Sequence, residues 1–142
     1  MKNILVPIDG SEGSVRALQA AINLAKTLNG DSAIFAVNVQ APIISGNVTR
    51  FFSAEDINAF YQDEGRVALA PAIPVLEASG VKFTHEVVVG PIAPTLIEYG
   101  KKHNCDQIFM GTRGLGPVSG LILGSIATKV ISLSAVPVTL VK

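Results

Sequence analysis

The chain has 142 residues, a length that fits one domain and is too short for two domains with full-sized cores. Apolar residues make up 49% of it and charged residues 15%, a composition that excludes intrinsic disorder. Its 11 basic and 11 acidic residues cancel, so the molecule has no net field to attract nucleic acid or an anionic membrane. We expect a single domain over residues 1–142 that binds neither.

Cysteine usage and the distribution of apolar residues predict a compartment. Cys105 is the only cysteine, so no intrachain disulfide can form, which is typical of a reducing environment. The apolar stretch after Lys2 ends at Asp9 and is shorter than the core of a signal peptide. The uncharged stretch at 114–128 is also shorter than the roughly 20 residues of a membrane span. We expect a cytoplasmic protein.

The first third of the chain predicts two strands joined by a helix. A continuous apolar run at residues 4–8 is typical of a strand that is covered on both faces. The next apolar residues have the spacing of an amphipathic helix that ends at Asn29-Gly30: Val15, Leu18, Ile22, Ala25 and Leu28. A second buried strand is expected at 33–39, followed by a loop of about a dozen residues.

The middle of the chain predicts a helix interrupted by proline and then an edge strand. Ser53 can cap a helix that begins at Ala54, and Pro71 and Pro74 predict a break near residue 70, with a second segment ending at residue 80. Residues 81–89 alternate at first between apolar and polar, with His85 on the apolar side. Alternation of this kind favours a strand at the edge of a sheet.

The last third continues the alternation of helices and strands. A third helix has Pro91 and Pro94 in its first turn and ends in cations at 101–103, and a fourth strand follows at 107–110. Apolar residues at spacings of four and three mark a last helix: Ile122, Ile126, Val130 and Leu133. A fifth strand at 136–141 contains Pro137, which favours an edge position. The order predicts an α/β fold, an open doubly wound parallel sheet with helices on both faces.

Ligands of such sheets bind beyond the carboxyl ends of the strands, and two loops there stand out. Asp9 follows the first strand, where a carboxylate can bind a ligand or, with about equal weight, can be only a turn residue or a helix cap. The second loop, residues 111–125, has five glycines before a helix, and free backbone amides at a helix N-terminus favour an anion. No Asp or Glu follows residue 107, whereas Arg113, Lys129 and Lys142 make this segment locally positive.

The known phosphate-binding fingerprints do not fit this loop. Pro117 and Val118 occupy the positions that a Walker motif gives to Lys and Ser/Thr. Gly10 and Gly13 also lack the three-glycine spacing of a dinucleotide site. A nicotinamide or flavin enzyme is therefore disfavoured.

The pattern Gly111-x2-Gly114-x9-Gly124-Ser125 resembles the ATP-binding signature of the universal stress protein family. The opening residues 4–11 and the closing residues 136–141 are also similar to that family, so the resemblance covers the whole chain. It implies a five-stranded, Rossmann-like sheet of order 3-2-1-4-5 that binds ATP across its first and fourth strands.

The resemblance also implies a set of nucleotide-binding residues. Pro7 and Asp9 would line the adenosine, and the backbone of Val37 or of Val39 would meet the adenine, a choice that stays open here. Glycine amides and the Ser125 hydroxyl would bind the ribose and phosphates, accompanied by Mg²⁺. Ala127 stands where some members have a hydroxyl. The complete expected set is Pro7, Asp9, Val37, Val39, Met110, Gly111, Arg113, Gly114, Gly124, Ser125 and Ile126.

These features predict an ATP-binding regulatory or stress-tolerance module rather than an efficient enzyme. Asp9 and Glu12 are the only candidate bases, so we expect at most slow ATP hydrolysis, or self-phosphorylation at Ser119 or Ser125. No catalytic residue and no protein metal ligand is predicted. The alternative is a nucleotide-independent dimeric stress or scaffold protein. A homodimer through the apolar edge strand 136–141 is expected on either interpretation, and a further protein partner is left unidentified.

Overall fold

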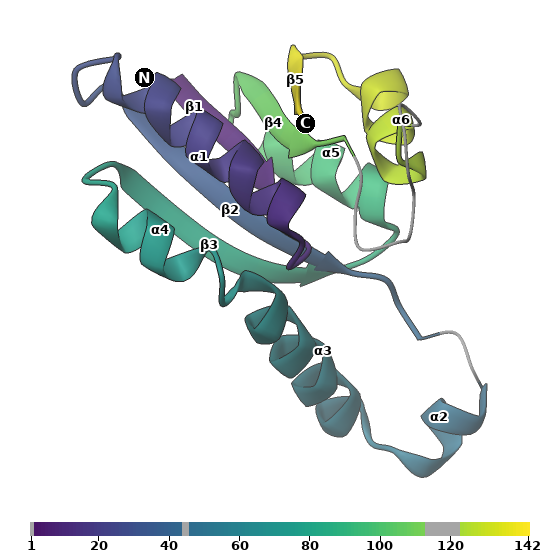
Figure 1. Ribbon diagram of the computed structural model, residues 1–142. Coiled ribbons are helices and arrows are strands. Elements are labelled where there is room, and N and C mark those ends of the chain that lie inside the picture. The colour runs from purple at the N-terminus through teal and green to yellow at the C-terminus, as the bar shows by residue number, and fades with distance from the viewer. Residues whose placement is uncertain (1, 44–45, 113–122) are drawn as a thin grey trace.

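The computed structural model describes residues 2–43, 46–112 and 123–142. Five parallel strands form one sheet in the order β3-β2-β1-β4-β5 (Figure 1). The strands are β1 (Lys2–Pro7), β2 (Ser32–Gln40), β3 (Lys82–Val89), β4 (Gln107–Gly111) and β5 (Val138–Val141). The helices are α1 (Glu12–Lys26), α2 (Gly46–Phe51), α3 (Ala54–Leu69), α4 (Ile73–Ala78), α5 (Ile92–Lys102) and α6 (Ser125–Leu133). The predicted doubly wound sheet and its strand order are confirmed.

The central strand β1 is buried on both faces, which explains its continuous apolar run. Ile4 and Val6 pack with α1 and α4 on one face of the sheet, in a core that also contains Leu18 and Leu76. Leu5 points to the other face, where α5 and α6 cover a second core. No helix within the described ranges is long and apolar enough to cross a membrane.

Helix α1 begins at Glu12, before the apolar spacing that predicts it from Val15, and ends slightly before the predicted Asn29-Gly30. Ser11 is its N-cap and accepts a hydrogen bond from the Ser14 N–H. The helix ends at Lys26, and Asn29 (φ 52°) and Gly30 (φ 82°) form the left-handed turn that leads into β2. The buried stripe consists mostly of small residues, so the helix lies close to the sheet: Ser14, Ala17, Leu18, Ala21, Ile22 and Ala25.

The break after α3 confirms the effect that the sequence assigns to proline. Ser53 caps α3, and its side chain and that of Asp56 form a reciprocal capping box. The helix ends at Leu69, and Pro74 lies in the first turn of α4, where no helical hydrogen bond is lost. The expectation of a loop after β2 was wrong in one respect, because that segment contains the short helix α2.

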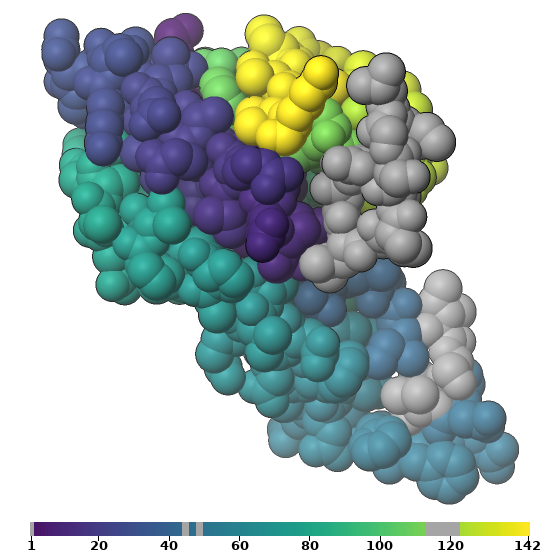
Figure 2. Space-filling view, in the orientation of Figure 1, coloured from purple at the N-terminus to yellow at the C-terminus, as the bar shows by residue number. Residues whose placement is uncertain are grey.

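Helices α2 and α3 form an arm that projects from the body of the molecule (Figures 1 and 2). The carboxyl half of α3 packs on the sheet through buried Gly65 and Leu69. Most residues of its first two turns are exposed, as are Phe51, Phe52 and Phe60. Tyr61 of α3 contacts the segment that follows β2, because its hydroxyl accepts a hydrogen bond of 2.6 Å from the Ile43 N–H.

The expected apolar stripe of α6 was largely wrong. Val130 is buried, but Ile126 and Leu133 are 38% and 44% exposed, and Ile122 lies outside the described residues. The helix packs against α5 near the edge of the sheet, so the buried stripe is narrow and contains Ala127 beside Val130. The terminal strands β3 and β5 are the two sheet edges, as the alternation at 81–89 and Pro137 predict.

Candidate functional site

A cavity of about 340 Å³ opens beyond the carboxyl ends of β1, β2 and β4, beside the first turn of α6. It lies at the point where the strand order reverses, because β2 and β4 flank β1 on opposite sides. Every predicted site residue that the structure describes lines it: Pro7, Asp9, Val37, Val39, Met110, Gly111, Gly124, Ser125 and Ile126. Arg113 and Gly114 lie outside the described residues. Contact of any of these residues with a ligand stays a prediction.

The turn after β1 holds the carboxylate of Asp9 in a fixed position. The backbone N–H of Ser11 donates to Asp9 Oδ1 at 2.9 Å, and the Ser11 hydroxyl donates to the same oxygen. Gly10 has φ +89°, a backbone conformation that L residues rarely adopt, and lies against the backbone of Ala68 in α3. Asp9 is therefore a turn residue and a cavity residue at once, whereas the helix cap is Ser11.

The end of β2 distinguishes the two valines that the sequence leaves open. The Ile8 N–H donates to the Val37 carbonyl at 2.8 Å, so that carbonyl already has a partner. Backbone groups alternate sides along a strand, so the N–H and C=O of Val39 point to the same side, beyond the last residue of β1. The described part of the chain offers them no partner there. Among the described residues, Val39 thus presents an unpaired donor and an unpaired acceptor at the cavity.

Two glycines of the predicted signature, Gly111 and Gly124, have structural roles that are separate from anion binding. A Cβ on Gly111 would lie 3.1 Å from the backbone C and O of Gly13, so a side chain there would fit only if the first turn of α1 moved by a few tenths of an ångström. The Gly124 N–H donates to the Thr112 carbonyl at 2.7 Å and is not available as an anion donor. For Gly124, this differs from the expectation that glycine amides would be the donors.

Backbone N–H groups without a helical acceptor lie instead in the first turn of α6. The Thr128 N–H bonds the Gly124 carbonyl, which leaves the backbone N–H groups of Ser125, Ile126 and Ala127 without a helical acceptor. No side chain of the described residues caps this helix end. Three amides that have no acceptor among those residues, and the positive end of the helix dipole, therefore lie at the cavity.

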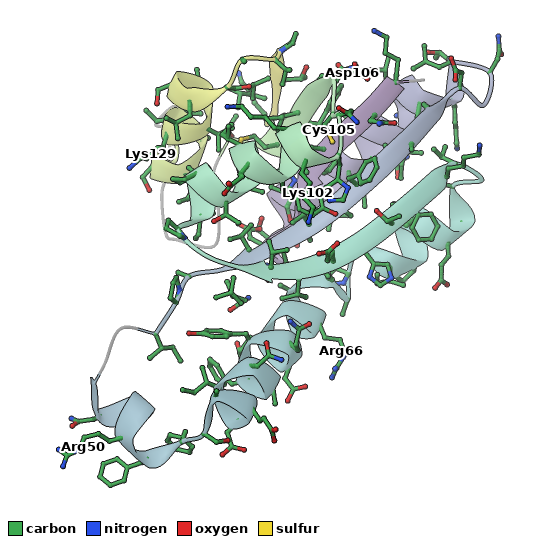
Figure 3. All side chains as sticks on the ribbon, turned by 180° about the vertical axis from the view of Figure 1, so that it is seen from behind. Arg50, Arg66, Lys102, Cys105, Asp106 and Lys129 are labelled. Atoms are coloured by element: carbon green, nitrogen blue, oxygen red, sulfur yellow. The ribbon has the colours of Figure 1, made fainter. Side chains whose placement is uncertain are left out.

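The walls of the cavity are mostly apolar and nearly uncharged. Ile92, Leu96 and Met110 form apolar walls that belong to the core between the sheet and α5. Asp9 is the one ionisable side chain among the described lining residues. Lys129, which contributes to the positive segment of the sequence, is exposed on α6 and points away from the body (Figure 3). The described residues contain no cluster of three or more His, Cys, Asp or Glu side chains that would hold a metal.

The perturbed titratable groups lie away from this cavity. Burial raises the pKa of the Cys105 thiol to about 11, and the charge of Asp106 acts in the same direction (Figure 3). A thiol that stays protonated is a poor nucleophile, which agrees with a structural role. Burial, together with Glu86, raises the pKa of Tyr99 to about 12. His103 packs against the Tyr99 ring at a centroid distance of 4.1 Å.

Sequence reasoning did not single out several residues that line the cavity, among them Ser14, Asn38 and Thr112. Asn38 is 3% exposed, and its side chain donates a 2.8 Å hydrogen bond to the Ile8 carbonyl. A polar residue in an otherwise apolar buried strand was the available signal, because a buried amide needs partners.

Comparisons by sequence and by structure both find similar proteins over nearly the full length of this chain. A sequence model described as the universal stress protein family matches residues 1–142. A universal stress protein of Methanocaldococcus jannaschii is 35% identical over 142 residues, covering 99% of this chain and 82% of the relative. Among solved structures, the hypothetical protein MJ0577 superimposes with a TM-score of 0.84 at 27% identity, covering 99% of this chain and 95% of that one.

Two further solved structures hold nucleotides and are similar in fold. A universal stress protein in complex with cAMP has a TM-score of 0.73 at 24% identity, over 99% of this chain and 97% of that one. A universal stress protein of Archaeoglobus fulgidus in complex with dAMP has a TM-score of 0.68 at 21% identity, over 100% and 98% of the two chains.

Proposed function

This chain belongs to the universal stress protein family, and on that premise we propose that it binds ATP in the cavity described above. In this proposal it is a cytoplasmic, nucleotide-responsive regulatory or stress-tolerance module. One observation carries the proposal: free backbone groups of Val39 and free amides of the α6 N-terminus lie on the wall of the same cavity. Relatives of similar fold that hold cAMP and dAMP support the choice of an adenine nucleotide.

The end of the cavity at β2 suits an adenosine. The hydrogen-bonding edge of adenine has an acceptor, N1, beside a donor, N6, and the free Val39 N–H and C=O complement that pair. Apolar side chains such as Met110 offer faces against which a flat ring packs. Asp9 has one oxygen engaged by Ser11, and we assign the other to a ribose hydroxyl. Pro7 would complete this wall.

The end of the cavity at α6 suits the phosphates. The amides of Ser125, Ile126 and Ala127 would donate to phosphate oxygens, with the Ser125 hydroxyl as a further donor. Arg113 and Gly114 remain part of the proposed set although they lie outside the described residues. Because Asp9 is the one carboxylate in the described lining, Mg²⁺ would be bound mainly by the phosphate oxygens themselves.

We assign the protein a binding role with at most slow hydrolysis. Asp9 is on the proposed adenosine side, so no described side chain of the lining is placed to activate water at a terminal phosphate. Ser125 is exposed at the phosphate end and is the described candidate for self-phosphorylation, whereas Ser119 lies outside the described residues. A mass increase of one phosphate after incubation with Mg-ATP would demonstrate that reaction.

The proposal includes a homodimer formed through the segment 136–141. Strand β5 is a sheet edge, and Val136, Val138 and Leu140 are half-buried in the single chain. Leu133 of α6 is 44% exposed and adds apolar surface that a second copy would cover. The same surface supports the alternative function, a dimeric scaffold protein whose function is independent of nucleotide. Light scattering at micromolar concentration tests the dimer, and a monomer would contradict it.

A charge substitution at the α6 N-terminus tests nucleotide binding. Ser125→Asp places a carboxylate at a helix start, where it favours the helix but repels phosphates. We expect wild type to bind Mg-ATP in a calorimetric titration and Ser125→Asp to lose at least tenfold in affinity while still binding adenosine. Ser132→Asp is the matched control, because Ser132 is an exposed serine at the other end of the same helix, and this variant should bind as wild type does. Failure of the wild type to bind any adenine nucleotide would favour the scaffold function.

A further inference from the structure

Asn38 is an asparagine within a buried strand, and the protein itself occupies both ends of its amide. Its Nδ2 donates to the Ile8 carbonyl at 2.8 Å, and its Oδ1 accepts from Gln40 Nε2 at 2.7 Å. The residue is 3% exposed although it borders the cavity. Its amide is therefore committed to the chain rather than offered to a ligand, and its effect on the site must be sought in the groups that it holds.

The Asn38 side chain replaces the backbone group that would donate the next hydrogen bond between β1 and β2. The parallel register pairs Pro7 with Val37, and the Ile8 N–H donates to the Val37 carbonyl. In a parallel ladder the next bond would run from the Val39 N–H to the Ile8 carbonyl. In the structure that carbonyl accepts from Asn38 Nδ2 instead, and the ladder bond to Val39 is absent among the described residues.

We propose that Asn38 is a positioning residue for the base: by capping the Ile8 carbonyl it ends the β1–β2 ladder early and keeps the Val39 N–H free to bind adenine. This inference rests on the proposed function, since it concerns the adenosine end of that cavity. Without the Asn38 amide, the Ile8 carbonyl would lack a partner and the Val39 N–H would be the complementary group that continues the ladder. The Val39 N–H would then be hydrogen-bonded within the sheet and would no longer be available to adenine.

The test compares Asn38→Leu, which retains most of the volume and removes the amide, with wild type. Hydrogen exchange of the Val39 amide is followed by NMR without ligand and with AMP, and affinities are measured for AMP and for ribose 5-phosphate. In wild type we expect fast exchange of the Val39 amide that slows at least tenfold with AMP. In Asn38→Leu we expect slow exchange without ligand, at least tenfold weaker AMP binding, and unchanged ribose 5-phosphate binding.

Two further variants keep the test decisive. Gln40→Leu removes the hydrogen bond to Asn38 Oδ1 but leaves the bond to the Ile8 carbonyl, so its Val39 exchange and AMP affinity should match wild type. If Asn38→Leu does not fold, Asn38→Asp replaces it, because a carboxylate has the same shape and cannot donate to that carbonyl.

The outcomes separate this inference from the function on which it rests. Equally fast Val39 exchange in wild type and in the Asn38 variant overturns the inference, as does a parallel loss of AMP and ribose 5-phosphate binding. If wild type binds neither ligand, the proposed function fails. Slow Val39 exchange in the unliganded Asn38 variant would still support the effect of Asn38 on the ladder.

Discussion

Substituting Gly65 with alanine should overpack the contact between α3 and β3. A Cβ at this position would lie 2.4 Å from both Val87 methyl carbons and 2.9 Å from Val87 Cβ, well inside ordinary contact distances. Rotation of the valine side chain cannot relieve the overlap, because its Cβ is itself too close. Gly65 is buried, so the helix must move away from the strand or the strand must bend.

The expected cost follows from two opposing effects. Overpacking of a well-packed contact costs about 1–3 kcal/mol, and alanine in a helix interior recovers about 1 kcal/mol over glycine. Because the new Cβ overlaps three atoms of Val87, the upper part of the overpacking range applies, about 2–3 kcal/mol. We therefore expect Gly65→Ala to lower the free energy of unfolding by about 1–2 kcal/mol, and Tm by roughly 3–8 °C. Urea unfolding followed by circular dichroism measures the first quantity, and calorimetry measures the second.

A control and a double mutant make the reasoning refutable. Gly46→Ala is the matched control, since a Cβ there meets no atom within 4 Å, and its stability should be close to that of wild type. Adding Val87→Ala to Gly65→Ala removes the two clashing methyl groups, so the double mutant should be more stable than the sum of the single changes predicts, by about 1 kcal/mol. Full stability in Gly65→Ala, or strict additivity in the double mutant, would show that this contact is not as tight as described.

Two other predictions concern the α3 cap and the buried thiol. Ser53→Ala removes the Asp56 N–H acceptor of the capping box and should cost about 0.5–1 kcal/mol, visible as faster hydrogen exchange in the first turn of α3, with Ser132→Ala as a silent control. Because burial raises the folded pKa of Cys105 from 9.0 to about 11, its contribution to stability is complete below pH 9 and is lost as the pH rises toward 11. Cys105→Ala should flatten the loss of stability over that range, and an identical pH profile in both proteins would contradict the assignment.

The sequence predicted the fold well where one physical signal dominated. The unbroken apolar run at 4–8 identified the doubly covered strand, and Pro71 and Pro74 predicted the break between α3 and α4. The strand order came from the family resemblance, because periodicity does not say which strands are neighbours. Helix α2 was missed because its six residues are too few for a helical pattern to be recognised.

The sequence predicted which residues lie together at this edge of the sheet, whereas their role in binding stays a prediction. Each described residue of the expected set lines the cavity, because carboxyl ends of parallel strands meet at one edge. The hydrogen-bond partners of the backbone amides were harder to predict. Gly124 was expected to donate to phosphate, yet its amide bonds Thr112, a contact set by backbone geometry that no residue type reveals. Likewise the Asn38 side chain donates to the Ile8 carbonyl, 30 positions away, and this partner is known only once the sheet is formed.

The central position of β1 affects the order in which the cavity is assembled. Its pairing with β2 is local, but its pairing with β4 waits for residues about 100 positions later, such as Asp106, which accepts from the Asn3 N–H. The wall formed by Ser125 and its neighbours comes later still. A nascent or truncated chain that ends before α6 therefore has the Asp9 turn and the β2 edge but no complete cavity. Ligand binding would distinguish a finished chain from an unfinished one, and a bound nucleotide would stabilise the late contacts that synthesis adds last.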